Sequence, residues 1–374
     1  MIASPQDSGT PAEIACPRCR APIRTRDGEL VCTQHGAVGR RGTDATFLFA
    51  DDDAYWGEID RDRMRRVNAD ARLRGWSAAV QQHLAGTDLL PYVQHPARAD
   101  WRVLFPLDRE RTVSLDVGAG WGAISFGLAP HVRRHYALER VPERLEFIAI
   151  RKLQDGVENV VPLCADLHAV PLLPASLDLV AVNGVLEWAG LVDPERAPHR
   201  APREPGVLQE AFLRQLCLLL RPGGRLYVGI ENRYGRLFWR GTPDHQGLRY
   251  TSLMPRALAR AYSRWRAARS PRTFVTESDY RTWTYSLRGT RQLLERCGFQ
   301  DVEAYAVVPG YNAPMQIVPL ADPGAFLYLA TRLQTSGLAS LRRAVRVATC
   351  ALHLEAQVTS CFAFTARVPD LGAR

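Results

Sequence analysis

The stretch VSLDVGAGWGAISFGLA, Val113 to Ala129, decides the fold of the region around it. Its first five residues favour a buried β-strand, three glycines follow within five positions, and the remainder has the pattern of a helix. Glycine allows a backbone to come close to a ligand. A strand, a glycine loop and a helix in this order predict a ligand site at the carboxyl end of the strand.

The composition limits the class of protein. The chain has 374 residues, of which 46% are hydrophobic and 23% charged, as in a soluble globular enzyme. The first residues lack the pattern of a signal peptide, and no uncharged apolar run reaches the roughly 18 residues of a membrane span. Eight cysteines in a chain of this length do not form a disulfide framework. We expect a cytoplasmic enzyme without a membrane span, and the sequence specifies no oligomeric state.

The net charge of +9 raises nucleic acid as an alternative partner. Lys152 is the only lysine, so the positive charge comes almost entirely from arginine. Together with abundant Ala, Leu, Pro and Gly, this bias is typical of a GC-rich genome. The charge by itself therefore does not select an anionic partner.

Five segments follow one another along the chain. They are a disordered polar tail (1–15), a Cys/His module (16–50), a helical linker or lid (51–110), an α/β domain with a cap insertion (111–321, cap 233–282) and a helical extension with a closing strand (322–374). From Arg111 onward, short apolar runs alternate with helical stretches, which predicts βαβ units and a parallel sheet.

The predicted strands and helices of the α/β domain have definite bounds. The strands are Val113–Val117, His135–Leu138, Val160–Cys164, Leu177–Asn183, Arg225–Ile230, Val302–Val308 and, at the end of the chain, Cys361–Val368. The helices are Glu143–Gln154, Val207–Leu220 and Leu287–Cys297, the last closed by Gly298, and residues 322–358 also have a helical pattern.

Two ligands compete for the glycine loop. Gly118, Gly120 and Ala123 satisfy the dinucleotide pattern G-x-G-x-x-G/A, which predicts NAD. Acidic and amide residues also follow the predicted strands, and the carboxyl ends of parallel strands meet at one edge. These residues are Asp116, Glu139, Asp166 and Asn183. Carboxylates repel a pyrophosphate and suit a cationic sulfonium ligand, so we expect S-adenosylmethionine.

Each of these residues then has a physical role. Glu139 offers two oxygens to the two ribose hydroxyls. Asp166 accepts a hydrogen bond from the adenine amino group. Asp116 and Asn183 suit the ammonium group at the methionine end of the cofactor. The complete predicted cofactor set also includes neighbouring residues: Asp116, Gly118, Ala119, Gly120, Glu139, Arg140, Asp166, Leu167 and Asn183.

These motifs resemble those of class I S-adenosylmethionine-dependent methyltransferases over residues 103–310. The matching segments are LDVGAGWG (115–122), YALER (136–140), CADLHAVPLLPASLDLVAVNGVLEWAG (164–190) and LLLRPGGRLYVGIENRYG (218–235). The resemblance implies a Rossmann-like α/β fold with a seven-stranded sheet whose last strand is reversed. It also implies that NGVLEWAG (183–190) borders the acceptor, and this segment differs from the NPPY type that acts on planar nitrogens.

The Cys/His module has the spacing of a zinc site. In CPRCRAPIRTRDGELVCTQHG, Cys16-x2-Cys19 and Cys32-x2-His35 form two knuckles, and Asp27–Gly28 predicts the hairpin turn between them. About 35 residues hold too little core to fold alone, which favours a structural Zn²⁺. The module resembles zinc ribbons found ahead of some bacterial methyltransferase domains and the zinc-ribbon activators of tRNA methyltransferases. Four protein ligands leave no open position, so we expect no catalysis there.

Two residues are candidates for the catalytic base. Glu187 follows the fourth predicted strand by one turn, and its alternative is a helix-face carboxylate paired with arginine. His245, in GTPDHQG, has Asp244 as a possible orienting partner, and its alternative is an exposed loop histidine. We expect no carboxylate cluster of the kind that marks a catalytic Mg²⁺.

The cap combines arginines with aromatic residues: Arg233, Arg236, Arg240, Arg249 and Arg272, with Tyr234, Trp239, Tyr250, Trp265 and Trp283. Arginine binds phosphate or carboxylate, and aromatic faces stack on sugars or bases. The stretch GIENRYGRLFWRGTPDHQGLRYTSLMPR (229–256), with TYS (284–286) and PGYNAP (309–314), resembles methyltransferases that accompany glycosyltransferases in bacterial surface-polysaccharide clusters. The resemblance implies O-methylation of a sugar, glycan or other small-molecule acceptor. The alternatives are an RNA methyltransferase and a non-catalytic scaffold that binds the cofactor.

Overall fold

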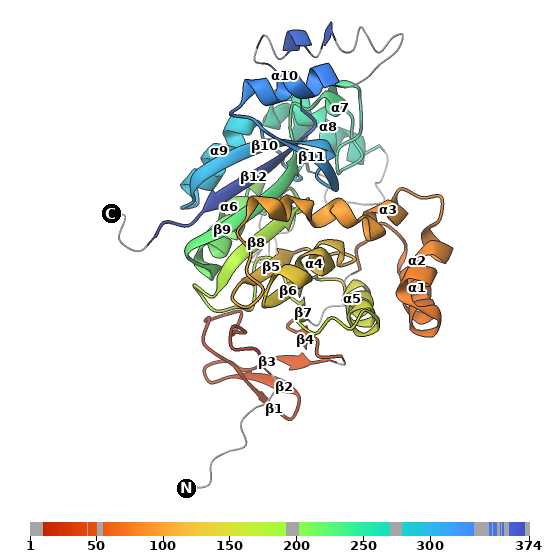
Figure 1. Ribbon diagram of the computed structural model, residues 1–374, viewed down its shortest axis with the longest axis vertical. Helices are drawn as coiled ribbons and strands as arrows, with labels where there is room; N and C mark the ends of the chain where they lie inside the picture. The colour runs from red at the N-terminus through yellow and green to blue at the C-terminus, as the bar shows by residue number, and fades with distance from the viewer. Residues whose placement is uncertain are drawn as a thin grey trace. The chain divides into compact units, whose positions relative to one another are not determined.

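A computed structural model describes most of the chain (Figure 1). The described residues are 10–42, 44–50, 55–191, 202–269, 279–332, 344–345, 347–349, 352, 354 and 359–370. The chain forms two compact units. Unit 1 comprises residues 1–181, 215–225 and 370–374, and unit 2 comprises 182–214 and 226–369. The strands β8 (Leu177–Asn183) and β9 (Leu220–Glu231) and the helix α6 (Pro205–Leu219) pass from one unit into the other.

The central strands of unit 1 are parallel and buried. They are β5 (Val113–Val117), β6 (Arg134–Leu138), β7 (Val160–Cys164) and the first residues of β8. Val117 lies opposite Leu138, and Leu138 opposite Leu163, so the three strands end at one edge. Continuous apolar runs are typical of strands covered on both faces. The predicted bounds of β5, β7 and β8 are confirmed, whereas β6 begins one residue earlier than predicted.

Helices connect and cover these strands. α4 (Ala123–Leu128) follows the glycine loop, the short η2 (Ala129–His131) follows α4, and α5 (Pro142–Gln154) lies between β6 and β7. Pro142 starts α5 at a position where its missing N–H costs no helical hydrogen bond. The helix therefore begins one residue before the predicted start.

The Cys/His module is a small antiparallel sheet attached to unit 1. Its strands are β1 (Arg24–Arg26), β2 (Glu29–Cys32), β3 (Gly36–Arg41) and β4 (Phe47–Leu48). Asp27 and Gly28 both have positive φ, 52° and 84°, as a two-residue hairpin requires, and the predicted turn is confirmed. β4 then pairs with β7 in the parallel direction, with Leu48 opposite Cys164.

The segment before the module is not a loose tail throughout. Residues 1–9 lie outside the described part, but Ile14 is buried and forms an isolated bridge with Leu172. Glu13 accepts a hydrogen bond from Tyr136 and forms ion pairs with Arg133 and Arg134. The expectation of disorder was wrong for residues 13–15, because an apolar side chain and a carboxylate find partners on the sheet.

Four helical elements precede β5, as predicted for residues 51–110. They are α1 (Arg61–Arg74), α2 (Trp76–Leu84), α3 (Leu89–Gln94) and η1 (Pro96–Leu104). Asp60 caps α1 by accepting a hydrogen bond from the backbone N–H of Arg63 at 2.8 Å. Met64 and Val67 of α1 share an apolar cluster with Phe147 of α5. This packing fixes the helical segment on the α/β core of unit 1.

Unit 2 contains the other half of the α/β architecture. β9 is longer than predicted. The cap insertion follows it in the chain, and then come the strands β10 (Gln300–Gly310), β11 (Ala313–Pro319) and β12 (Cys361–Arg367). β10 runs antiparallel to both β11 and β12. The helix α9 (Leu287–Arg296) agrees with the predicted Leu287–Cys297 to within one residue. In the predicted helical region 322–358, the described residues include the helix α10 (Pro323–Arg332).

The cap insertion also belongs to unit 2. It contains α7 (Arg236–Trp239), η4 (Thr251–Leu253) and α8 (Arg256–Ala267), while residues 270–278, Arg272 among them, lie outside the described part. Arg260 of α8 pairs with Asp279 and Glu204, which ties the insertion to the segment before α6.

Within the described residues, twelve strands form one mixed sheet in the order β1-β2-β3-β4-β7-β6-β5-β8-β9-β12-β10-β11. The prediction of a seven-stranded sheet was wrong in number. The middle of the order, from β7 to β10, holds seven strands, and β12 runs antiparallel to β10. The Cys/His module and β11 add the other strands at the two edges, which the motif pattern of the central domain does not report.

No helix in the described part of the chain has both the length and the apolar composition required to cross a membrane.

Candidate active site

The glycine loop of unit 1 presents bare backbone at the carboxyl end of β5. Gly118 and Gly120 have φ of 71° and 55°, a region that residues with side chains rarely adopt. The N–H groups of Gly118 and Ala119 both donate to the carbonyl of Leu138, 2.9 Å away, which holds the loop against the end of β6. The loop thus has the geometry that close approach of a ligand requires.

Asp116 is a buried carboxylate beside this loop. It is 2% exposed, and Oδ2 accepts one hydrogen bond from Ser125 Oγ at 2.9 Å. Burial raises the pKa of Asp116 to about 7, with a further rise from Glu139, against the lowering effects of Ser125 and Arg98. A carboxylate held in this way favours a ligand that brings a positive charge.

Glu139 directly follows β6, and one of its oxygens is directed to the backbone of the glycine loop. Oε2 accepts from the N–H of Gly120 at 2.8 Å, and Oε1 accepts from the N–H of Val141 at 2.9 Å. Each carboxylate oxygen can accept a further hydrogen bond. Glu139 therefore shapes the loop and still has the acceptor capacity that two ribose hydroxyls need.

Asp166 follows β7 and forms an ion pair with Arg140. Its Oδ1 also accepts from the N–H of His168 at 2.8 Å, and the carbonyl of the neighbouring Leu167 accepts from Gln215 Nε2 at 2.7 Å. A hollow of about 290 Å³ borders these residues, lined by Pro17, Phe49, Ala50, Arg140, Ala165, Asp166 and Ala169. The predicted adenine side of the site thus has a wall that comes partly from the Cys/His module.

The helical segment covers the same loop, which the sequence did not reveal. A Cβ on Gly120 would lie 3.6 Å from the hydroxyl of Tyr92, and Arg98 stacks on the Tyr92 ring at 3.8 Å from its centroid. Glu58 accepts from Trp121 Nε1 at 3.4 Å and pairs with the buried Arg144. No spacing in the sequence links these helices to the loop, because the contacts depend on how the helices pack.

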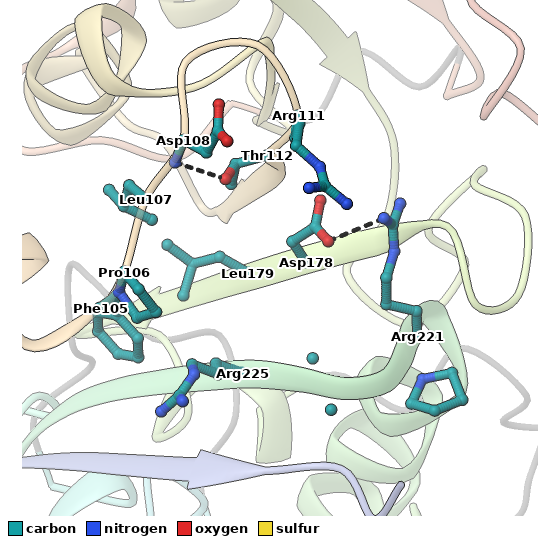
Figure 2. Close-up of a pocket in the computed structure, with 13 residues that line it drawn as sticks. Phe105, Pro106, Leu107, Asp108, Arg111, Thr112, Asp178, Leu179, Arg221 and Arg225 are labelled. Atoms are coloured by element: carbon teal, nitrogen blue, oxygen red, sulfur yellow. Dashed lines mark hydrogen bonds and ion pairs between the residues drawn. The ribbon is translucent and has the colours of Figure 1, made fainter. Parts of the chain in front are cut away.

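A second hollow of unit 1, about 370 Å³, lies at the opposite ends of the strands (Figure 2). Thr112 precedes β5 and Asp178 lies near the start of β8, so this hollow is away from the carboxyl edge. Figure 2 shows Arg111 and Arg221 directed toward Asp178, and Arg221 pairs with it at 2.9 Å. Its charges are largely satisfied internally, so it is not the candidate cofactor site.

Asn183, at the end of β8, belongs to unit 2. Its side chain is 7% exposed, and neither Nδ2 nor Oδ1 has a hydrogen-bond partner among the described residues. A Cβ on Gly229 of β9 would lie only 2.2 Å from Asn183 Oδ1, so a side chain there would displace the amide. A buried amide without partners is costly, and its predicted role toward a polar ligand stays a prediction.

Glu187 lies four residues after the end of β8 and is completely buried, directly before η3 (Trp188–Gly190). Neither of its oxygens accepts a hydrogen bond within the described part of the chain. His245 Nε2 is the nearest charged group, 3.4 Å from Glu187 Oε1. Burial and the nearby Glu231 raise the pKa of Glu187 to about 8, although His245 acts in the opposite direction.

His245 brings Glu187 and Glu231 together. Its Nε2 lies 3.1 Å from Glu231 Oε2, and the hydroxyl of Tyr311 donates to Glu231 Oε1 at 2.6 Å. Burial lowers the pKa of His245, but the carboxylates of Glu231 and Glu187 raise it to about 10. The ring also packs against Trp188, with centroids 4.9 Å apart. Unit 2 therefore contains a buried group of two carboxylates and one imidazole.

This arrangement differs from the alternatives to the two catalytic candidates. Within the described residues Glu187 pairs with no arginine, and His245 is not an exposed loop residue, because both face the same cluster. Asp244 does not orient His245: its oxygens accept from Thr251 and from the N–H groups of Gln246 and Leu248, so it holds a turn. The sequence analysis did not anticipate that two carboxylates, Glu187 and Glu231, lie close together.

Glu231 is the functional candidate that the sequence reasoning missed. It is the last residue of β9, and the rule that selected Asp116, Glu139, Asp166 and Asn183 was that polar residues end the strands of the sheet. The same rule applied to GIENRYG would have selected Glu231. No comparable signal marked Tyr311, which follows β10 in a turn.

The predicted zinc ligands converge in the Cys/His module. Cys16 Sγ lies 3.6 Å from His35 Nδ1, Cys19 Sγ 3.6 Å from Cys32 Sγ, and Cys32 Sγ 3.7 Å from His35 Nδ1. Zn–S and Zn–N bonds of about 2.3 and 2.1 Å in a tetrahedron place ligand atoms about 3.6 to 3.8 Å apart. The four side chains fit a tetrahedral metal, and the sulfur atoms are too far apart for a disulfide.

Several cap arginines are engaged inside unit 2. Arg233 donates to the carbonyls of Ser252 and Met254, and Arg256 stacks on Trp283. The aromatic residues Tyr234, Trp239 and Tyr250 are exposed, by 36%, 62% and 46%. The aromatic part of the predicted acceptor surface is therefore accessible, whereas part of the arginine charge is used in the fold.

Residues 108–245 match the family model described as "Methyltransferase domain". This part of the chain is thus similar to methyltransferase domains, and the matched range includes the glycine loop, Glu139, Asp166 and Glu187.

Curated relatives share part of this domain. The chain is 29% identical over 119 residues to the ubiquinone biosynthesis O-methyltransferase of Xylella fastidiosa (strain M23), covering 32% of this chain and 42% of that protein. It is 30% identical over 117 residues to a Methanothermobacter thermautotrophicus protein named "Probable cobalt-precorrin-6B C(15)-methyltransferase (decarboxylating)", covering 31% and 50%. The chain spans between 27% and 50% of the length of such relatives. Their names include an oxygen and a carbon acceptor, so the similarity does not select the methylated atom.

Among solved structures, phosphoethanolamine N-methyltransferase 2 of Haemonchus contortus in complex with S-adenosyl-L-methionine matches with a TM-score of 0.42 and 12% identity, covering 81% of this chain and 60% of that chain.

Proposed function

We propose that the protein transfers a methyl group from S-adenosylmethionine to a hydroxyl of a sugar, glycan or other small-molecule acceptor. The observation that supports this proposal is the set of buried carboxylates around the glycine loop. The loop lies in the region that matches the methyltransferase family model. Asp116 and Glu139 lie beside bare backbone, where a phosphate ligand would meet repulsion and a cation would meet attraction.

When bound, S-adenosylmethionine supplies a methyl group on a positively charged sulfur. In the proposed complex, Asp116 pairs with the ammonium group and Glu139 accepts hydrogen bonds from the ribose hydroxyls. Asp166 and the Leu167 backbone receive the adenine, and Gly118 to Gly120 leave room for the rest. Asn183 contributes its unpaired amide, and Arg140 holds the Asp166 carboxylate. Positioning of this kind supplies up to about 7–11 kcal/mol of the barrier reduction in two-substrate reactions.

Glu187 and His245 are the proposed catalytic residues on the acceptor side. In the overall reaction the S–CH₃ bond breaks as the O–CH₃ bond forms, and the hydroxyl proton must leave. A buried carboxylate whose oxygens accept no hydrogen bonds has capacity for that proton. His245 and Glu231 hold charge beside it, and the segment that follows β8 is expected to border the acceptor in class I methyltransferases.

The exposed aromatic residues of the cap favour a carbohydrate-like acceptor. Trp239 Nε1 donates to the Tyr234 carbonyl at 3.0 Å, which orients its exposed ring, and Tyr250 lies against Gly241 nearby in the chain. Exposed aromatic rings with a polar edge suit the apolar faces of sugars. The Cys/His module binds a structural Zn²⁺ in this proposal and has no role in the chemistry.

RNA is the alternative acceptor, because the chain carries a net charge of +9 and a pI near 9.3. Internal use of Arg233, Arg256 and Arg260 reduces the charge that the cap offers to phosphates. The two acceptors differ in their response to salt: binding of RNA weakens steeply with ionic strength, whereas binding of an uncharged acceptor does not.

The first test of the proposal is ligand binding followed by turnover. S-adenosylhomocysteine should raise the melting temperature of the purified protein. An unchanged melting temperature would instead support the alternative of a non-catalytic scaffold. Formation of S-adenosylhomocysteine from S-adenosylmethionine should then depend on addition of glycosides or sugar phosphates from a panel. Turnover with short RNA but with no member of that panel would contradict the carbohydrate assignment.

A further inference from the structure

Three ligand atoms of unit 2 converge as they would around a metal ion. His245 Nε2 lies 3.1 Å from Glu231 Oε2 and 3.4 Å from Glu187 Oε1, and all three atoms lie within 4.8 Å of one another. Metal–ligand bonds of about 2.1 Å separate neighbouring ligand atoms by about 3.0 Å in an octahedron and 3.4 Å in a tetrahedron. The two separations from His245 Nε2 match these values.

The arrangement of charges in the cluster favours a cation. Two carboxylates face each other across one imidazole, so a single proton on His245 neutralises only one of them. Glu187 is completely buried, and neither of its oxygens has a hydrogen-bond donor in the described part of the chain. An ionised carboxylate without donors is expensive to bury, and coordination of a metal offsets that cost.

The surroundings of the cluster support ligand geometry rather than a simple ion pair. Tyr311 donates to the far oxygen of Glu231, Oε1, at 2.6 Å, which leaves Oε2 directed at His245. Hydrogen bonds of this kind orient metal-ligating carboxylates. The side chains of His245 and Glu231 remain 24% and 19% exposed, so an ion and one further ligand can reach the cluster.

We propose that Glu187, Glu231 and His245 bind one divalent first-row metal ion whose open positions take an oxygen of the acceptor. A nitrogen ligand with two carboxylates suits Mn²⁺, Fe²⁺ or Zn²⁺ better than Mg²⁺ or Ca²⁺, which prefer oxygen alone. The inference deepens the proposed function, because a hydroxyl or vicinal diol that binds the ion becomes more acidic and is fixed in place. Glu187 Oε2 accepts no hydrogen bond within the described residues and remains for the released proton.

The test is direct binding of Mn²⁺ to the full-length protein in its zinc-containing form. Mn²⁺ is the probe because the thiolates of the Cys/His module prefer softer ions. Titration followed by the electron paramagnetic resonance signal of free Mn²⁺ should show one bound ion per chain. Glu187→Gln and Glu231→Gln should each weaken this binding by at least about tenfold.

Glu210→Gln is the matched control, because Glu210 lies in unit 2 and pairs at the surface with Arg296. It should bind Mn²⁺ like the wild type. Absence of bound Mn²⁺ in the folded wild-type protein up to about 1 mM, or equal binding by both cluster variants, overturns the metal site. Binding of S-adenosylhomocysteine is measured on the same samples. If the protein binds S-adenosylhomocysteine but not Mn²⁺, only the metal site is refuted. If it does not bind S-adenosylhomocysteine, the proposed function is refuted separately.

Discussion

The affinity of the protein for S-adenosylhomocysteine should fall as the pH decreases from 7.5 to 6.0. The reason is Asp116, whose pKa in the free protein is raised to about 7. Only the ionised carboxylate pairs with the ammonium group of the ligand. Below pH 7 a proton must therefore leave Asp116 before the pair forms, and this step weakens the observed binding.

The size of the effect follows from that pKa. With a pKa of about 7, the dissociation constant rises by a factor of about 11 at pH 6.0 and about 1.3 at pH 7.5, relative to high pH. The predicted change over this interval is about eightfold, or about 1.2 kcal/mol at 25 °C. The charged neighbours of Asp116 are Arg98 from η1, which lowers its pKa, and Glu139 from β6, which raises it.

Isothermal titration calorimetry at several pH values measures this dependence, and the proton released on binding appears as a buffer-dependent enthalpy. Asp116→Asn retains the volume and removes the titration, so its affinity should be lower and nearly independent of pH. A wild-type affinity that stays constant from pH 7.5 to 6.0, or a variant with the same slope, would refute the pairing of Asp116 with the ammonium group.

Three further outcomes are expected. Glu139→Ala should weaken S-adenosylhomocysteine binding at least about tenfold by calorimetry, because the carboxylate also holds the N–H of Gly120 in the glycine loop and the N–H of Val141 before α5. Purified protein should contain about one zinc per chain by elemental analysis, and replacement of Cys16 and Cys19 by serine should abolish it. Glu187→Gln and His245→Ala should lower turnover by more than they lower cofactor affinity, as separate kinetic and calorimetric measurements show.

Each of these experiments has a matched control. Glu146→Ala removes a partly exposed carboxylate from α5 and should leave cofactor affinity unchanged. Cys217→Ser should retain the zinc. A folded protein without metal would contradict the zinc site. Wild-type affinity in Glu139→Ala would contradict the contact of Glu139 with the ribose. Full turnover in both Glu187→Gln and His245→Ala would exclude these two residues from catalysis.

The sequence was sufficient for the central strands because their pattern is local. Each of β5, β7 and β8 is a short apolar run, and the predicted bounds coincide with the observed ones. The number of strands was not predictable in the same way. β4 has only two residues, and its pairing with β7 depends on contacts between distant segments rather than on a local pattern.

The same distinction applies to the site. Asp116 and Glu139 were found because strand ends share an edge, and the structure places both beside the glycine loop. The partner of His245 was assigned to its sequence neighbour Asp244, but Glu231 approaches it from 14 residues away. Tertiary packing selected the partner, because Asp244 already accepts the N–H groups of its own turn.

The position of β12 has a consequence for synthesis on the ribosome. This strand lies between β9 and β10 and follows both in the chain, so each of them lacks one of its two neighbouring strands until residues 361–367 have been made. Nascent chains in that interval expose unpaired strand edges, which favour association with other chains. Shortened versions that stop before Cys361 should accumulate in inclusion bodies even though they retain the whole matched methyltransferase region.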